Sequence, residues 1–138
     1  MSEGRSIQDI RIVIVDDLAS YREILHEILR SMGVTHITEA TNGVEAFEKI
    51  IMAAKGNEPF DLIISDINMP KMNGLELLKN VRGTKKLGKV PFILVSTENE
   101  KKIIIEALVL EISDYLIKPY DVATASAKIK KIILKALA

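Results

Sequence analysis

The alternation of short apolar runs with longer segments of helical periodicity is the feature that most constrains the fold. Four runs are rich in strand-forming residues and too short to be buried helices, namely 12–15, 60–64, 91–95 and 115–117. A fifth run, 34–41, has few apolar anchors, which is typical of a strand at the edge of a sheet. The sequence therefore predicts five strands.

A segment with apolar residues at three- and four-residue spacing follows each predicted strand. These segments indicate helices over 18–32, 44–54, 75–81, 99–110 and 122–137. Parallel strands need crossover connections, and these are right-handed. The five strand-then-helix units therefore predict one α/β domain over 1–138, with a doubly wound five-stranded parallel sheet and helices on both faces.

Composition narrows the classes of function. Lys plus Arg and Asp plus Glu both count 19, so no overall positive charge favours nucleic acid. No apolar run approaches the ~18 residues that span a bilayer, and the first residues do not resemble a signal peptide, so we expect a cytoplasmic protein without membrane insertion. Cysteine is absent, which excludes thiol chemistry, and His26 falls on the polar side of a helix whose apolar side includes Tyr21.

Polar side chains gather where the predicted strands end. They are Asp16 and Asp17 after the first strand, Asp66 after the third, Ser96 and Thr97 after the fourth, and Lys118 after the fifth. The carboxyl ends of parallel strands meet at one edge of the sheet, so we expect these groups to converge. Two carboxylates about 4 Å apart repel by about 4 kcal/mol at an effective dielectric constant of about 20, so three of them favour a hard cation such as Mg²⁺.

This arrangement predicts phosphoryl transfer to Asp66. A carboxylate held at the end of a rigid strand can act as a nucleophile, while a metal ion and Lys118 neutralise the charge that develops. Each feature alone has a plainer interpretation: the acidic pair as a turn or helix cap, Ser96 and Thr97 as an N-cap, and Lys118 as a strand terminus. The presence of all of them, in order, favours the functional interpretation.

Five segments resemble the receiver domain of bacterial two-component response regulators. They read IVDD, ATNGVEAFE, DLIISDINMPKMNGLELL, VPFILVSTE and DYLIKPY, and the resemblance extends from about residue 11 to about residue 137. It implies a (βα)5 flavodoxin-like fold with strand order 2-1-3-4-5. It also implies a single-domain phosphoacceptor switch that catalyses only its own phosphorylation and dephosphorylation.

The resemblance assigns a metal site to the acidic residues. It implies that Asp66 is the phosphoacceptor and that Asp16 and Asp17 bind Mg²⁺ directly or through water. Asn68 would give the metal its backbone carbonyl. Mg²⁺ is therefore the expected cofactor.

The resemblance also assigns residues that would respond to the phosphoryl group. Ser96 would hydrogen-bond it, and Lys118, followed by a cis peptide bond to Pro119, would pair with it. Tyr115 matches an aromatic switch position, whose ring turns inward when the hydroxyl residue moves. We expect the switch to involve Ser96, Thr97 and Tyr115.

Two further positions are expected to set the lifetime of the phosphoryl group. Asn68 lies two residues beyond Asp66, and Glu98 lies two residues beyond Ser96. Their side chains can reach water that approaches the phosphoryl group, so we expect both to influence its hydrolysis.

Two other classes of protein share parts of this pattern. Haloacid-dehalogenase-like phosphatases also use a nucleophilic Asp, Mg²⁺ and a Lys at strand ends, but there the nucleophile follows the first strand, whereas here the pair Asp16 and Asp17 comes first. A nucleotide-binding module would need a glycine-rich turn after the first strand, and Asp16, Asp17 and Leu18 offer none. The receiver interpretation fits better than either.

One segment departs from the family pattern. Leu110, Glu111 and Ile112 stand where the family commonly has Ala-Gly-Ala. Without a glycine to adopt a left-handed C-cap, we expect the fourth helix to end differently or to run longer.

Output is expected through another molecule, because residues 120–138 have room for only one helix. The expected partners are a histidine kinase or a histidine phosphotransfer protein, and a downstream protein of a chemotaxis or phosphorelay pathway. A receiver fragment of a longer regulator fits the same sequence.

The fourth helix is apolar around nearly its whole circumference, so some of its side chains are expected outside the core. We expect an output surface at Ile104, Ile105 and Val109, beside the fifth strand and the lysines of the fifth helix, which could also support a weak homodimer. An extended core contact made by a longer helix is the alternative.

Overall fold

Five parallel strands form the centre of the protein. In the computed structural model, which describes residues 4–138, they are β1 (Arg11–Val15), β2 (His36–Ala40), β3 (Leu62–Asp66), β4 (Phe92–Ser96) and β5 (Asp114–Ile117). Their order across the sheet is β2-β1-β3-β4-β5. The predicted α/β fold and strand order are therefore confirmed, with strand ends displaced by one or two residues.

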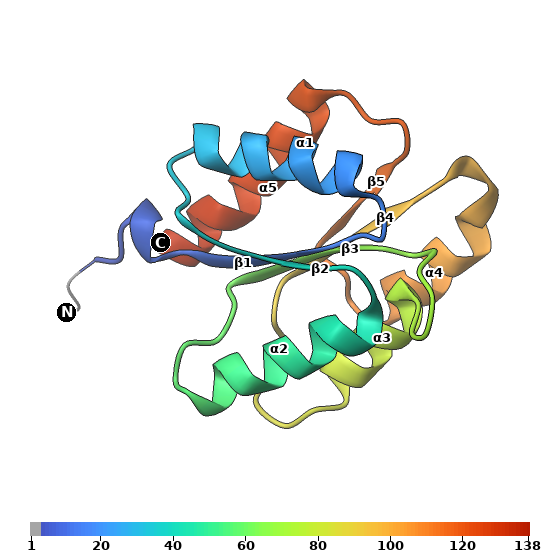
Figure 1. The fold of residues 1–138 in the computed structure, drawn as a ribbon, viewed down its shortest axis with the longest axis horizontal. Helices are drawn as coiled ribbons and strands as arrows, with labels where there is room; N and C mark the ends of the chain where they lie inside the picture. The colour runs from blue at the N-terminus through green and yellow to red at the C-terminus, as the bar shows by residue number, and fades with distance from the viewer. Residues whose placement is uncertain (1–3) are drawn as a thin grey trace.

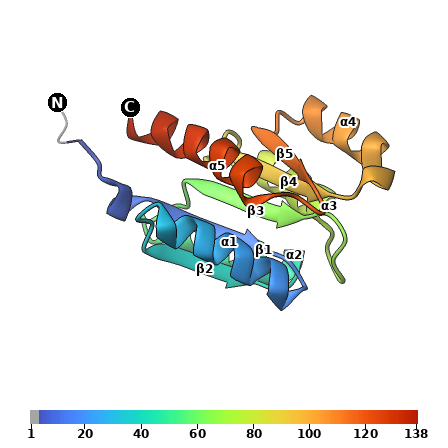
Figure 2. The same ribbon diagram turned by 90° about the horizontal axis from the view of Figure 1, so that it is seen from above.

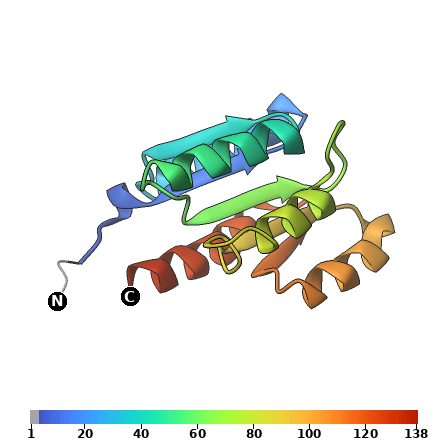
Figure 3. The ribbon, with the colours of Figure 1, turned by 90° about the horizontal axis from the view of Figure 1, so that it is seen from below.

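Helices cover both faces of the sheet, as Figure 1 shows. They are α1 (Ala19–Ser31), α2 (Gly43–Lys55), α3 (Gly74–Arg82), α4 (Lys101–Val109) and α5 (Val122–Leu137), with short 3-10 turns η1 (Ile7–Asp9) and η2 (Glu98–Glu100). The pair α1 and α5 lies on one face (Figure 2), and α2, α3 and α4 lie on the other (Figure 3). Among the described residues, no helix combines the length and the apolar character that crossing a membrane requires.

The core has two layers because successive side chains of a strand point to opposite faces. In β1, Val13 and Val15 pack toward α2, α3 and α4, whereas Ile12 and Ile14 pack toward α1 and α5. All residues of β3 and β4 are buried. Burial on both faces explains why these strands read as continuous apolar runs rather than as alternating patterns.

The end of α4 differs from the expectation. Glu111 adopts the left-handed conformation (φ 61°), and its N–H donates to the carbonyl of Leu108 at 3.0 Å. The N–H of Ile112 donates to the carbonyl of Ala107 at 3.3 Å. These two bonds form the glycine-type C-cap with a glutamate in place of glycine. The expectation that α4 would end differently or run longer is wrong.

Arg82, at the end of α3, supports this unusual cap. Its guanidinium donates to the carbonyls of Leu110 (2.8 Å), Glu111 (3.1 Å) and Val90 (2.8 Å). Carbonyls at the end of a helix lack partners within the helix, and a cation satisfies them well. Arg82 therefore ties α3, the start of β4 and the end of α4 together.

Candidate functional site

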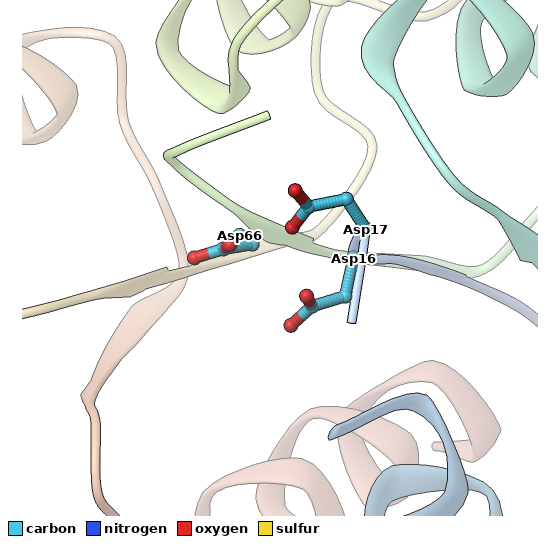
Figure 4. Close-up of side chains that lie close together, drawn as sticks. All are labelled: Asp16, Asp17 and Asp66. Atoms are coloured by element: carbon cyan, nitrogen blue, oxygen red, sulfur yellow. The ribbon is translucent and has the colours of Figure 1, made fainter. Parts of the chain in front are cut away.

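Three carboxylates meet at the carboxyl edge of the sheet. Asp16 and Asp17 follow β1, and Asp66 ends β3. Each offers an oxygen within 4.8 Å of the other two, and Figure 4 shows the three side chains gathered there. The register that pairs Val15 with Ser65 brings the aspartates that follow them side by side. The predicted convergence of these residues is confirmed.

The two buried carboxylates are held in the same way. One oxygen of each accepts a backbone N–H: Asp16 Oδ1 from Leu18 at 2.9 Å, and Asp66 Oδ1 from Ile67 at 3.0 Å. The other oxygen of each faces Lys118, whose Nζ lies 3.0 Å from Asp16 Oδ2 and 3.4 Å from Asp66 Oδ2. The backbone thus fixes both side chains while leaving an oxygen of each directed into the site.

Gly74 allows α3 to begin against the backbone of Asp66. A Cβ at Gly74 would lie 2.2 Å from the carbonyl oxygen of Asp66, a distance that no side chain can tolerate. The N–H of Gly74 donates to the carbonyl of Ile67 at 2.9 Å. This close approach braces the strand end that presents the Asp66 carboxylate.

The site carries more negative charge than its single lysine offsets. Burial, followed by the charge of Asp16, raises the pKa of Asp66 to about 6, although Lys118 and the N–H of Ile67 act in the opposite direction. For Lys118, burial lowers the pKa, but the hydrogen bond to Asp16 and the charges of both carboxylates outweigh it and raise the pKa overall. The lysine is therefore a permanent cation in a site that can accept another.

A divalent cation fits these donors. All three close groups are carboxylates, the oxygens of which Mg²⁺ prefers, and such an ion would offset both the burial and the neighbouring Asp16 charge that raise the pKa of Asp66. Asp17 is exposed and Asp16 is buried, so the cluster has an open side and a closed side. The acidic cluster is thus compatible with Mg²⁺. Asn68 is exposed in the loop after β3.

Ser96 and Thr97 differ in how their hydroxyls are used. Ser96 is fully buried at the end of β4, and its hydroxyl has no hydrogen-bond partner within residues 4–138. The hydroxyl and the N–H of Thr97 both donate to the Glu100 carboxylate, at 3.0 and 2.7 Å. The plainer interpretation as a cap therefore holds for Thr97. Ser96, in contrast, has a free hydroxyl beside the site.

Lys118 reaches the site directly from the end of β5. Its N–H donates to the carbonyl of Ser96 at 2.7 Å, and the predicted cis peptide bond to Pro119 is present. Tyr115, three residues earlier, is half-buried against the core layer that includes Ile104 and Ala107 of α4. Lys128 of α5 donates to the Tyr115 carbonyl at 2.6 Å and lies 4.9 Å from the centre of its ring. Glu98 is exposed in η2.

Two tyrosines lie beside the site that sequence reasoning did not place there. Lys118 Nζ lies 3.9 Å from the centre of the Tyr21 ring, and the Tyr21 and Tyr120 rings are 5.7 Å apart. The periodicity of α1 assigned Tyr21 only to an apolar stripe. The available signal was position, because Tyr21 lies in the first turns after Asp16 and Tyr120 directly follows the Lys118–Pro119 pair.

The expected output surface needs one correction. Ile104 is only 7% exposed and packs in the core with Ala107, one helical turn away, so the expectation that it lies on the surface is wrong. Ile105 (62%) and Val109 (79%) are exposed, together with Leu108 (55%). The alternative of a longer, fully packed helix does not hold either.

Comparisons with known proteins agree with this geometry. Residues 12–130 match the family model described as the response regulator receiver domain. The chain is 36% identical over 125 residues to chemotaxis protein CheY-3 of Vibrio cholerae, covering 91% of this chain and 92% of that protein. It is also 36% identical over 124 residues to the chemotaxis protein CheY homolog of Campylobacter jejuni, covering 90% and 92%.

Solved structures with the same fold include two close matches. The receiver (REC) domain of AraT, a response regulator from Geobacillus stearothermophilus, has a TM-score of 0.77 and 30% identity, covering 92% of this chain and 95% of that one. Chemotaxis protein CheY4 of Vibrio cholerae has a TM-score of 0.76 and 30% identity, covering 89% and 98%. The chain therefore belongs to the response regulator receiver domain family, the CheY-like signalling switches of two-component systems.

Proposed function

We propose that Asp66 accepts a phosphoryl group from a histidine kinase or a histidine phosphotransfer protein. The observation that carries this proposal is the cluster of three carboxylates with Lys118 across the ends of β1, β3 and β5. Asp66 has one oxygen fixed by a backbone N–H and the other directed into the site, which suits a nucleophile on a rigid element.

In the transfer step, the ionised Asp66 oxygen attacks the phosphorus of a phosphohistidine. The P–O bond to Asp66 forms as the P–N bond breaks, and the electron pair of that bond remains on the imidazole. Asp16, Asp17, Asp66 and Asn68 would hold Mg²⁺, which when bound neutralises phosphoryl oxygens and favours the ionised carboxylate. Lys118, already directed at Asp66 Oδ2, stabilises the remaining negative charge.

The free hydroxyl of Ser96 is the proposed sensor of the new group. Phosphorylation gives the Ser96 hydroxyl an acceptor, and we expect Ser96 to move toward it. This movement of Ser96 carries Thr97 and the start of α4 with it, because Thr97 is hydrogen-bonded to Glu100. Space opened by this movement admits the half-buried ring of Tyr115. The switch is then a shift between two existing conformations.

Loss of the phosphoryl group occurs by attack of water on phosphorus, which releases inorganic phosphate and restores the Asp66 carboxylate. Asn68 and Glu98 are both exposed, where their side chains can admit or orient that water. We expect a bulky apolar side chain at either position to slow dephosphorylation.

The phosphorylated form is proposed to act on a downstream protein through Ile105, Leu108 and Val109. Ile105 lies three residues from Leu108 and four from Val109, so these exposed side chains share one side of α4, and apolar side chains exposed together are typical of interaction sites. A chemotaxis or phosphorelay partner in the cytoplasm fits the similarity to chemotaxis regulators. Self-association into a weak homodimer is a second proposed use of the same surface.

Intact-protein mass spectrometry tests the phosphoacceptor directly. The protein is incubated with acetyl phosphate and Mg²⁺, and we expect the mass of one phosphoryl group to be added. Asp66→Asn should take up no label, and neither should the wild type in EDTA. Asp61→Asn is the matched control, because Asp61 is an aspartate at the opposite end of β3 and should leave uptake unchanged. Equal uptake by Asp66→Asn and the wild type would refute the proposal.

A further inference from the structure

The ammonium of Lys118 has three neighbours, and one of them is an aromatic ring. Its Nζ lies 3.0 Å from Asp16 Oδ2, 3.4 Å from Asp66 Oδ2 and 3.9 Å from the centre of the Tyr21 ring. The two carboxylates come from the ends of β1 and β3, and the ring comes from α1. A cation at this distance over a ring face is attracted by the ring's quadrupole.

The Tyr21 ring is itself held in place by Tyr120. Their ring centres are 5.7 Å apart at an interplanar angle of 48°, a tilted arrangement favourable for aromatic pairs. Tyr120 packs against the core between α1 and α5. Its hydroxyl is buried without a hydrogen-bond partner in the described chain, and burial, then the charge of Asp16, raises its pKa, so it stays neutral. Tyr120 therefore supports Tyr21 through its ring.

The ring differs from the carboxylates in carrying no net charge. A carboxylate that holds the ammonium also neutralises it, and both Asp16 and Asp66 are needed elsewhere when a metal ion binds or when Asp66 is modified. The face of the Tyr21 ring attracts the ammonium without neutralising its charge and without occupying either carboxylate. It can thus keep Lys118 in the site while leaving its charge available to a phosphoryl oxygen.

We infer that Tyr21 is a positioning residue for phosphoryl transfer and acts by holding the Lys118 ammonium over the Asp66 carboxylate. This inference rests on the proposed function of Asp66. It adds a residue of α1 to a site otherwise built from strand ends, and it makes the ring face, rather than the hydroxyl, the part of Tyr21 that matters.

The test compares two substitutions at Tyr21. Tyr21→Phe keeps the ring face and should phosphorylate from acetyl phosphate and Mg²⁺ at a rate within about twofold of the wild type. Tyr21→Leu keeps an apolar side chain but loses the quadrupole, and should be slower by roughly 5- to 30-fold, as expected from the usual strength of a cation–π contact. Rates are followed by intact-protein mass spectrometry, after circular dichroism has confirmed folding of each variant.

A double-mutant comparison separates positioning from simple packing. In a Lys118→Ala background, Tyr21→Leu should cause no further loss of rate, because the group it positions is gone. An equal further loss in that background would overturn the inference, as would equal rates for Tyr21→Leu and the wild type. If the wild type itself takes up no label at Asp66, it is the proposed function that fails.

Discussion

The helices α4 and α5 both flank β5, on opposite faces of the sheet (Figure 1), but they are held in different ways. In α5, Ala125, Ile129 and Ile133 form a buried stripe at four-residue spacing that packs with α1. In α4 only Ile104 and Ala107 are buried. The longer helix is thus fixed by its side chains, whereas the shorter one has little buried area to fix it.

Hydrogen bonds at the two ends of α4 hold the helix in place, because its few buried side chains contribute little. At its start, Glu100 binds the N–H and hydroxyl of Thr97, directly after the unpaired Ser96 hydroxyl. At its end, Arg82 binds the carbonyls that follow the helix. A helix anchored mainly at its two ends can respond to a small movement at one of them, which supports the proposal that α4 carries the output surface.

Truncation of one apolar side chain in each helix should show the largest contrast in stability. Ile129→Ala in α5 should lower the free energy of unfolding by about 3–4 kcal/mol, through lost burial and the cavity left behind. Leu108→Ala in α4 should change it by less than about 0.5 kcal/mol, because Leu108 is largely exposed. Urea unfolding measures both. Similar losses in the two variants would show that α4 is packed as firmly as α5.

Removal of the Arg82 guanidinium should have the next largest destabilising effect. Arg82→Ala leaves the carbonyls of Leu110, Glu111 and Val90 without their donor and should cost about 2–3 kcal/mol of unfolding free energy. Arg30→Ala, an exposed arginine in the last turn of α1, is the matched control and should cost less than about 0.5 kcal/mol. Equal stability of the two variants would show that the end of α4 does not depend on Arg82.

Neutralising Asp66 should stabilise the fold in a pH-dependent way. The folded pKa of about 6 lies above the ordinary value of 3.8, so between these values the folded state binds a proton that the unfolded state has lost. Wild-type stability therefore falls as pH rises through this window, and the penalty is complete above pH 6. Since one pKa unit corresponds to about 1.4 kcal/mol and the shift is about two units, Asp66→Asn should be more stable by about 3 kcal/mol at pH 7.5 in EDTA.

The gain from Asp66→Asn should shrink toward zero as the pH falls below the ordinary pKa of the carboxyl. Thermal unfolding across this pH range provides the measurement. Mg²⁺ should reduce the gain at pH 7.5, because a bound cation would offset the burial of the Asp66 charge and its repulsion by Asp16 in the wild type. A gain that did not depend on pH would contradict the electrostatic explanation.

Substitution of the left-handed residue after α4 should have the smallest effect on stability. Glu111→Gly removes the strain of a side chain at φ 61° and should raise the free energy of unfolding by about 0.5–1 kcal/mol. Glu106→Gly, within α4, should instead lower it by about 1 kcal/mol, because glycine is a poor helix former. Denaturant titrations of the pair decide the matter: destabilisation by both would mean that Glu111 is not strained.

The sheet and the main site were predictable because, in the strands, the apolar pattern of the sequence matches the burial of the residues in the structure. Residues of β3 are buried on both faces, so their apolar run reads as a strand, and parallel strands oblige Asp16, Asp66 and Lys118 to meet at one edge. The identity and order of those groups also pointed to the receiver family, which the family model over residues 12–130 shows.

The details of α4 were not predictable from its own residues. With apolar side chains in nearly every direction, the helix gives no sign of which face is buried, so Ile104 and Leu108 could not be told apart. The left-handed cap at Glu111 is accompanied by hydrogen bonds from Arg82, which is distant in the sequence. The contact of Tyr21 with Lys118 likewise depends on how α1 sits beside the end of β5.

Hydrogen exchange with and without a phosphoryl mimic tests most directly whether the Asp66 site acts on α4. With beryllofluoride and Mg²⁺, peptides covering 97–109 should change their exchange rates severalfold, while peptides covering α5 should stay within about twofold, because local opening follows the weakest packing. Asp66→Asn should show no change in either region. Altered exchange in α5 with α4 unchanged would contradict the account.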